Sequence, residues 1–262
     1  MGEPSTVIGL IAAFHTSQDR LAATLEGLDE GQAKAQSYDD DWTIADVASH
    51  LGSGAVIFTD HLVSGRDGTE ASGLDAAQVV WDEWNARAPL DQVHSAVAAN
   101  AAFVDQVEAL TPEQRDAWQL KLFGMDLDLA GFLRMRISEH VLHTWDITVA
   151  LDPTSTIPAN LAMQVLGNLP MLAGWAGQKT ETQISVEVRT TDPEHAFHLD
   201  LGPGGVGLRP SYDDTAASAE LRLPTEAFVR LVYGRLDPDH TPADVVADGV
   251  DLDVLRGVFP GI

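Results

Sequence analysis

Apolar residues recur at helical spacing through the first two thirds of the chain. The first apolar face predicts a helix and is formed by Val7, Ile11, Phe14, Leu21, Leu25 and Leu28. A second helix should begin at Thr43, because Thr43 and Asp46 have the spacing of a capping box. Further helical patterns are found around Trp81 and Trp84, over residues 90–107, after Thr111-Pro112, over residues 127–151 and over residues 157–175.

From Gln183 onward the apolar period becomes two, which is typical of strands. The alternation predicts strands over residues 184–188, 197–201 and 219–223, and Thr225 is expected to cap a helix after the last of them. Helices followed by strands and a helix indicate two domains. We therefore predict a helical domain over residues 1–178 and a small α/β domain over residues 179–262.

The composition narrows the function classes. With 40 acidic and 15 basic residues, the chain has a net charge of −25. Such a charge argues against nucleic acid and against anionic membrane surfaces as partners, because both attract positive fields. No apolar run has the length of a membrane span, and the first residues lack the basic start of a secretory signal. A cytoplasmic location is the resulting expectation.

The chain contains no cysteine. Disulfides, thiolate metal sites, iron–sulfur clusters and cysteine nucleophiles are therefore excluded. Any metal ion must be held by histidine and carboxylate side chains, and any thiol chemistry needs a thiol from outside the protein.

One pattern suggests such a metal site. Glu139 and His143 are four residues apart in a predicted helix, so their side chains lie on the same face. His50, beside Leu51 on the second predicted helix, could supply a third ligand. Each residue alone is more simply explained as a solvent-facing or hydrogen-bonded side chain. A divalent cation would, however, compensate a carboxylate and two imidazoles on mostly apolar faces.

Two segments then resemble a known family. Residues 42–51, WTIADVASHL, are similar to the second-helix motif of the DinB-like metalloenzyme superfamily, in its mycothiol-dependent maleylpyruvate isomerase branch. Residues 136–146, RISEHVLHTWD, resemble that branch's second motif, and the distance between the two motifs also agrees. Residues 219–235 look like part of the family's sterol-carrier-like α/β domain.

The resemblance implies a four-helix bundle that holds Zn²⁺, or another divalent metal, on His50, Glu139 and His143, with open positions for water or a thiol. Mycothiol would be the thiol cosubstrate, and its metal-activated thiolate would attack a small electrophile. Release of the adduct would make the protein an S-transferase. Rotation followed by expulsion of the thiol would make it a cis–trans isomerase.

Several other side chains are weaker candidates. Arg235, which follows Gly234 at a predicted helix end, could reach the domain junction and hold a substrate or thiol carboxylate, although a surface arginine is an equal alternative. Arg87 has a similar, weaker case. Asp146 lies on the face of Glu139 and could orient a ligand imidazole, or simply be a carboxylate near a helix end. His140 points away from Glu139 and is interpreted as structural.

The sequence thus predicts a metal- and mycothiol-dependent enzyme acting on a small electrophile. Two other interpretations remain open at this point. In the first, a metal-dependent hydrolase activates water instead of sulfur, and it would work without added thiol. In the second, a non-catalytic bundle binds a metal or ligand without turning it over.

Overall fold

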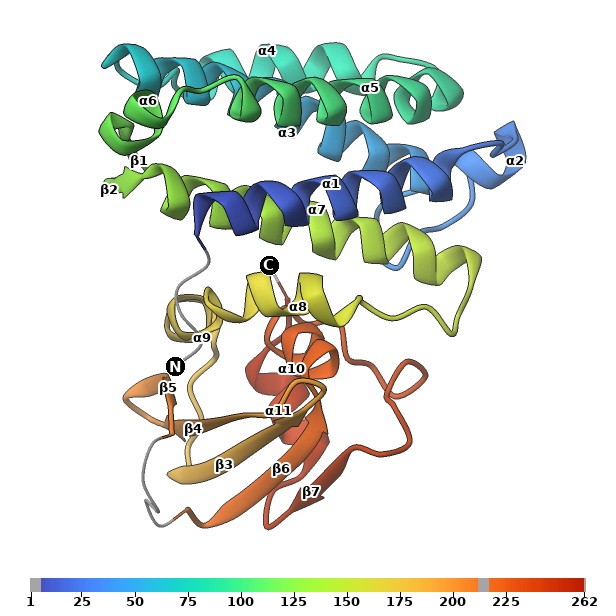
Figure 1. The fold of residues 1–262 in the computed structure, drawn as a ribbon. Helices are drawn as coiled ribbons and strands as arrows, with labels where there is room; N and C mark the ends of the chain where they lie inside the picture. Colours follow the sequence, from blue (N-terminus) through green and yellow to red (C-terminus); the bar gives the residue numbers. More distant parts are fainter. Residues whose placement is uncertain (1–5, 212–216, 262) are drawn as a thin grey trace. The chain divides into compact units, whose positions relative to one another are not determined.

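Residues 7–151, whose apolar residues recur at helical spacing, form a set of long helices joined by loops (Figure 1). The computed structural model describes residues 6–211 and 217–261. Its first elements are α1 (Val7–Leu25), α2 (Glu30–Ala33), α3 (Ile44–Asp67), α4 (Leu74–Asn85), α5 (Pro89–Glu108), α6 (Pro112–Ala117), the strands β1 (Gln119–Leu122) and β2 (Met125–Asp128), and α7 (Leu129–Leu151).

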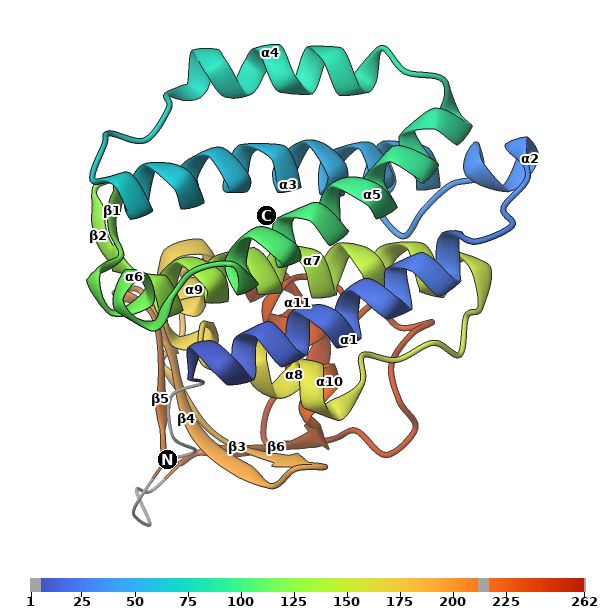
Figure 2. The same cartoon turned by 45° about the horizontal axis from the view of Figure 1, so that its top comes forward.

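Four of these helices pack around one another. The helix α1 contacts α5 and α7, and α3 contacts the same two helices, so that the contacts close into a ring. Figures 1 and 2 show the four helices side by side, with α4 outside them against α3. The ring brings α3 and α7, which are far apart in sequence, into direct contact.

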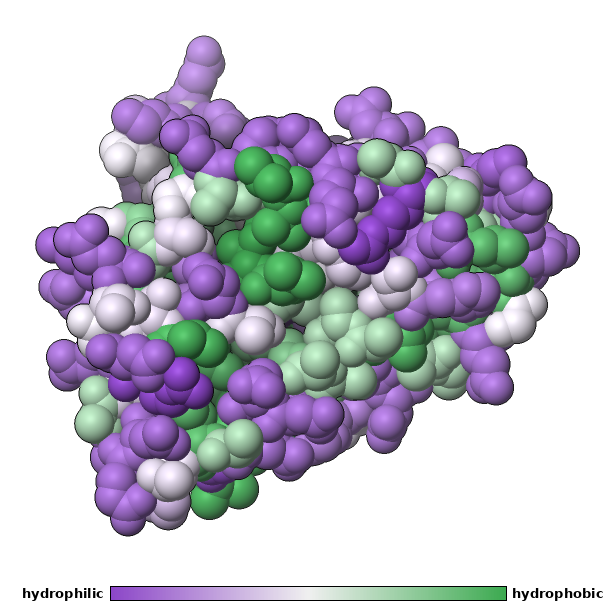
Figure 3. Space-filling view, turned by 90° about the horizontal axis from the view of Figure 1, so that it is seen from above, coloured by the Kyte–Doolittle hydropathy of each residue, from purple (hydrophilic) through white to green (hydrophobic). Residues whose placement is uncertain are grey.

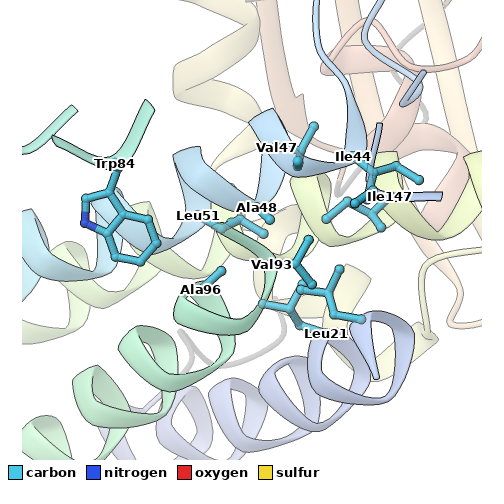
Figure 4. Close-up of a cluster of buried hydrophobic side chains, with 12 residues drawn as sticks. Leu21, Ile44, Val47, Ala48, Leu51, Trp84, Val93, Ala96 and Ile147 are labelled. Carbon is cyan, nitrogen blue, oxygen red and sulfur yellow. The ribbon is translucent and has the colours of Figure 1, made fainter. Parts of the chain in front are cut away.

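Small and branched apolar residues fill the space between these helices. Figure 4 shows Leu21 of α1, Leu51 of α3, Val93 of α5 and Ile147 of α7 in one buried cluster, which Trp84 closes from α4. As predicted, Thr43 and Asp46 form a capping box at the start of α3. The cap and the buried face together fix the axial position of α3, and hence of His50.

Gly52 of α3 lies directly against the Trp84 side chain of α4. A Cβ atom placed on Gly52 would lie 2.1 Å from the Trp84 ring. We expect Gly52→Ala to destabilise the protein by about 1–3 kcal/mol through overpacking, although alanine is the better helix former. Chemical denaturation would measure the change. Gly167→Ala is the control, because a Cβ there meets nothing within 4 Å, and a loss of stability equal to that of Gly52→Ala would contradict the explanation.

The remaining elements form a second unit around a sheet. They are α8 (Ala159–Leu166), α9 (Leu169–Ala176), β3 (Ile184–Thr191), β4 (His195–Gly202), β5 (Gly205–Pro210), β6 (Ala219–Pro224), α10 (Thr225–Val232), β7 (Val246–Asp248) and α11 (Leu252–Val258). The strand order is β5-β4-β3-β6-β7, and among the strands of the described residues only the β3–β6 pair is parallel. One face buries Val186, Val188 and Leu221, as the alternation predicts. The chain is therefore an α+β protein.

The structure changes two details of the sequence-based prediction. Along the chain, the boundary between the two compact units falls between Ser155 and Thr156, not near residue 178. The reason is that α8 and α9 pack against α10 and β5. The apolar pattern over residues 157–175 predicted helix correctly but could not tell which core the helix would join. Thr225 does not cap α10: Pro224 holds the cap position, and the Thr225 hydroxyl donates instead to the Pro193 carbonyl over 2.8 Å.

Hydrophilic residues predominate on the face seen in Figure 3, while hydrophobic residues gather in a central band and a few smaller groups. None of the helices in the described ranges is both long and apolar enough to cross a bilayer.

Candidate metal centre

Two helices supply the predicted ligands. His50 lies two turns into α3, and its neighbours Ser49 and Leu51 are buried while its own side chain stays partly accessible. Glu139 and His143 lie one turn apart near the middle of α7, whose start is capped by Asp128. Because α3 packs against α7, the three side chains meet at one place.

The donor atoms of these side chains converge closely. Nε2 of His50 lies 3.3 Å from Oε2 of Glu139, and Nε2 of His143 lies 3.5 Å from the same oxygen. One ligand atom from each residue falls within 4.8 Å of the others. Within the described part of the chain, no other three His or carboxylate side chains converge in this way.

Asp146 determines how His143 presents its ring. The Asp146 carboxylate is fully buried, and the Nδ1–H of His143 donates to its Oδ2 over 2.9 Å. A neutral His143 held in this tautomer turns an unprotonated Nε2 toward the carboxylate of Glu139. Two acceptors then face each other, and only a cation between them, either a proton on His143 or a metal ion, makes the arrangement favourable. The residues present therefore fit a divalent ion.

The pKa values agree with this description. Burial alone would raise the pKa of Glu139, but hydrogen bonds from His143 and His50 outweigh it and hold that pKa well below its usual value. Burial lowers the pKa of His50 and remains dominant there. Burial also acts to lower the pKa of His143, but the hydrogen bonds to Asp146 and Glu139 raise it overall. Near neutral pH the site thus contains an ionised carboxylate and a neutral His50.

The site is partly open to solvent. The side chains of His50 and Glu139 are 32% and 37% exposed, whereas that of His143 is 12% exposed. The half-buried Trp42 covers both imidazoles, with ring centroids 5.1 Å from His50 and 5.9 Å from His143. An external ligand can therefore reach the donor atoms beside an apolar wall.

Comparison with known proteins shows the family to which the chain that carries this site belongs. Residues 14–148 match the family described as the mycothiol maleylpyruvate isomerase N-terminal domain, and they include all three donor residues. The chain belongs to this family. No curated protein sequence matches it.

Solved structures with the same fold cover both units of the chain. The crystal structure of the mycothiol-dependent maleylpyruvate isomerase aligns with a TM-score of 0.66 at 12% sequence identity, over 92% of each chain. A histidine-to-alanine mutant of that enzyme aligns with the same values. At this identity the likeness shows that the fold is shared.

Other residues considered from sequence take different places in this maleylpyruvate isomerase family member. Arg87 pairs with Glu83 and lies over the Trp84 ring at 3.9 Å. Arg235 is buried in the second unit, where its Nη1 donates to the Tyr233 carbonyl over 2.9 Å. A freely exposed helix-end arginine is thus not what the fold builds.

Two residues next to the donors on α7, His140 and Arg136, are buried. His140 is buried, as a structural role requires, and its Nδ1 lies 2.7 Å from Oγ of Ser17. Arg136 is buried as well, one turn before Glu139, although the second motif by itself assigns this arginine no role. A lone arginine at helical spacing normally indicates a solvated face, so its burial had no signal in the sequence beyond its place in the motif.

Asp146 offers a direct test of how the donors are oriented. We expect Asp146→Asn to weaken metal binding by roughly 10- to 100-fold, because an outer hydrogen-bond partner fixes the tautomer and basicity of a ligand imidazole. Competition with a chromophoric chelator would measure the affinity. Asp126→Asn, at an exposed position of β2, is the matched control. Equal affinities of the two variants would show that Asp146 serves the fold alone.

Proposed function

We propose that this protein is a metal-dependent enzyme that uses mycothiol as a nucleophile toward a small electrophile, as an S-transferase or a cis–trans isomerase. The observation that carries the proposal is the convergence of His50, Glu139 and His143 at a point that a small molecule can reach. Membership of the mycothiol maleylpyruvate isomerase family supports the choice of thiol.

We propose Zn²⁺ as the metal. Two imidazoles and one carboxylate are a usual ligand set of catalytic zinc, which keeps a further position open, whereas structural zinc is normally closed by four protein ligands. A divalent ion held there would bind the sulfur of the thiol and lower its pKa, so that thiolate is available at neutral pH.

Glu139, Asp146 and Trp42 would each have a separate role at the metal centre. Glu139 supplies the negative charge, because its carboxylate stays ionised. Asp146 fixes the ring of His143, and Trp42 excludes water from one side of the imidazoles. The ring of α1, α3, α5 and α7 supports the interpretation of the first unit as a DinB-like four-helix bundle, and we regard the second as sterol-carrier-like.

The absence of cysteine makes the thiol an external reactant. Its sulfur would form a carbon–sulfur bond with the electrophilic carbon. In a transfer, the leaving group departs with the bonding electron pair. In an isomerisation, the thiolate adds to a conjugated double bond, the former double bond rotates, and the same thiolate is expelled, so that no thiol is consumed.

A thiol panel tests the proposal. Zn²⁺-loaded protein would be mixed with a haloalkyl bimane and either mycothiol, glutathione or cysteine. A thiol of ordinary pKa is about 3% ionised at pH 7, so full ionisation alone predicts roughly 30-fold acceleration. Mycothiol should show it, glutathione and cysteine far less, and chelated protein none. Adding mycothiol to Co²⁺-loaded protein should also produce a sulfur-to-metal charge-transfer band.

Indifference to thiol would overturn this function. If metal-loaded protein shows no such band and processes substrates equally well without thiol, a hydrolase that activates water replaces it. If the metal binds but no thiol–electrophile pair or ester turns over, the non-catalytic binding protein becomes the better description.

Arg235 is our proposed contact for a substrate carboxylate. Charge-assisted hydrogen bonds contribute about 1.5–3 kcal/mol, so Arg235→Ala should raise the KM for a carboxylate-bearing electrophile by roughly 10- to 100-fold. The KM for a neutral electrophile and the metal content should stay unchanged. Arg87→Ala is the control, since Arg87 is already paired with Glu83. Equal losses for charged and neutral electrophiles would assign Arg235 to folding.

A further inference from the structure

Arg136 is a buried cation that forms no ion pair with any residue the structure describes. Its side chain is 1% exposed, and its Nη2 donates to two neutral acceptors, the Leu51 carbonyl at 2.7 Å and Oδ1 of Asn100 at 2.6 Å. Its Nε is buried without a hydrogen bond. Among the described residues, no carboxylate lies within 4.0 Å of its guanidinium. The Phe58 ring, 5.5 Å away, makes a cation–π contact but carries no counter-charge.

Such an arrangement is costly. A buried charge that lacks a counterion loses much of its hydration free energy, and proteins normally pair it or neutralise it. Arg136 does neither. Burial lowers its pKa to about 10, a value at which the guanidinium is still fully charged near neutral pH. The two hydrogen bonds of Arg136 to neutral acceptors do not explain why a charged side chain is buried here, so we looked for a neighbouring group that its charge affects.

The guanidinium lies beside the candidate metal centre. Arg136 precedes Glu139 by three residues on α7, so both lie on the same side of the helix. Its Nη1 reaches toward α3 at Gly54, one turn after His50, where an added Cβ would lie only 2.8 Å away. The missing side chain at Gly54 thus lets the charge approach the two helices that carry all three donors.

The charges around the centre show what Arg136 changes. Glu139 and Asp146 are the carboxylates that contact the donor imidazoles, and together they offset the two positive charges of a divalent ion. With their Nε2 atoms on the metal ion, His50 and His143 would be neutral, and burial keeps His140 neutral as well. Arg136 therefore leaves one net positive charge at the loaded centre, in surroundings of low polarity where that charge acts strongly. A single external anion would complete the balance.

We propose that Arg136 makes the metal centre selective for an anionic external ligand, such as a thiolate, over a neutral one of similar size. This inference rests on the metal site of the proposed function. Arg136 would act through the field at the open position, without touching the ligand. It is a positioning residue, and its effect should follow its charge and not its shape.

Ligand titrations of Co²⁺-loaded protein test this inference without turnover. Azide is the anionic probe and imidazole the neutral probe, and the visible spectrum of Co²⁺ reports binding of each. Arg136→Met removes the charge, while Arg136→Lys retains it. Asn100→Asp places a carboxylate on the oxygen that now accepts from Nη2 at 2.6 Å, and so neutralises Arg136 with almost no change of shape.

The expected results differ between the two probes. Removing one unit of positive charge near the metal centre should weaken azide binding by about 10- to 30-fold in Arg136→Met and in Asn100→Asp. Imidazole binding should stay within about twofold in both variants, and Arg136→Lys should behave like the wild type.

Four outcomes would overturn the inference or set it apart from the proposed function. Parallel losses of azide and imidazole binding in Arg136→Met, with an unchanged Asn100→Asp, would make Arg136 a structural support only. Unchanged azide binding in all variants would likewise reject the inference while leaving the metal enzyme intact. Failure of the wild type to bind Co²⁺ would reject both, whereas normal azide selectivity without any mycothiol reaction would reject the thiol function alone.

Discussion

Alanine at His143 should abolish stoichiometric metal binding and leave the helical fold intact. The wild type is expected to hold about one divalent ion per chain, since one set of three donors converges. His143 is the most enclosed of the three donors. No other described His or carboxylate side chain belongs to the donor group, so none is placed to replace its Nε2. The loss of affinity should exceed the roughly 10- to 100-fold typical of an outer partner. Elemental analysis of gently purified protein, with circular dichroism in parallel, would measure both quantities.

His50→Ala should behave in the same way, because His50 is the only donor that α3 contributes. His94→Ala is the matched control: His94 is an exposed histidine on α5, away from the donor set. A wild-type protein that stays metal-free after incubation with Zn²⁺ would disprove the site. A His143→Ala protein with full metal content would disprove this choice of ligands.

The donor set was accessible from sequence for a geometric reason. Glu139 and His143 are four residues apart, and any α-helix brings such a pair together. His50 is different, because its approach depends on α3 packing against α7, which no local pattern contains. The motif resemblance supplied that long-range information. The structure then brings all three side chains to one point.

Features that depend on tertiary packing escaped the sequence. The apolar helices α8 and α9 could have joined either core, and only their contacts with α10 and β5 decide it. The pairing of β7 with β6 arises from three residues without a clear alternation. His198 is buried on the sheet, where its Nε2 lies beside Ser185 and Asp200. Arg136 is the most important omission, since burial of a cation has no composition signal.

Acid should weaken the helical unit through His140. The side chain is 1% exposed, and burial, assisted by the charges of Arg136 and His143, lowers its pKa to about 3. In the unfolded chain the pKa returns to about 6.5, so the unfolded state takes up the proton first. Stability is therefore unaffected by His140 above that pH. It falls as the pH drops toward the folded-state value, by up to about 1.4 kcal/mol per pH unit.

A substitution without a titrating ring isolates this contribution. In His140→Asn, the amide can still meet the Ser17 hydroxyl that now lies 2.7 Å from Nδ1. The variant should be less stable than the wild type at pH 7, because it is smaller, but its stability should decline less steeply between pH 6.5 and pH 4. Urea denaturation of chelated protein, followed by tryptophan fluorescence, measures both slopes. Chelation removes the acid release of metal from the comparison, and the carboxylates common to both proteins cancel. Parallel slopes would mean that His140 is protonated in the folded protein, and burial would then not control its charge.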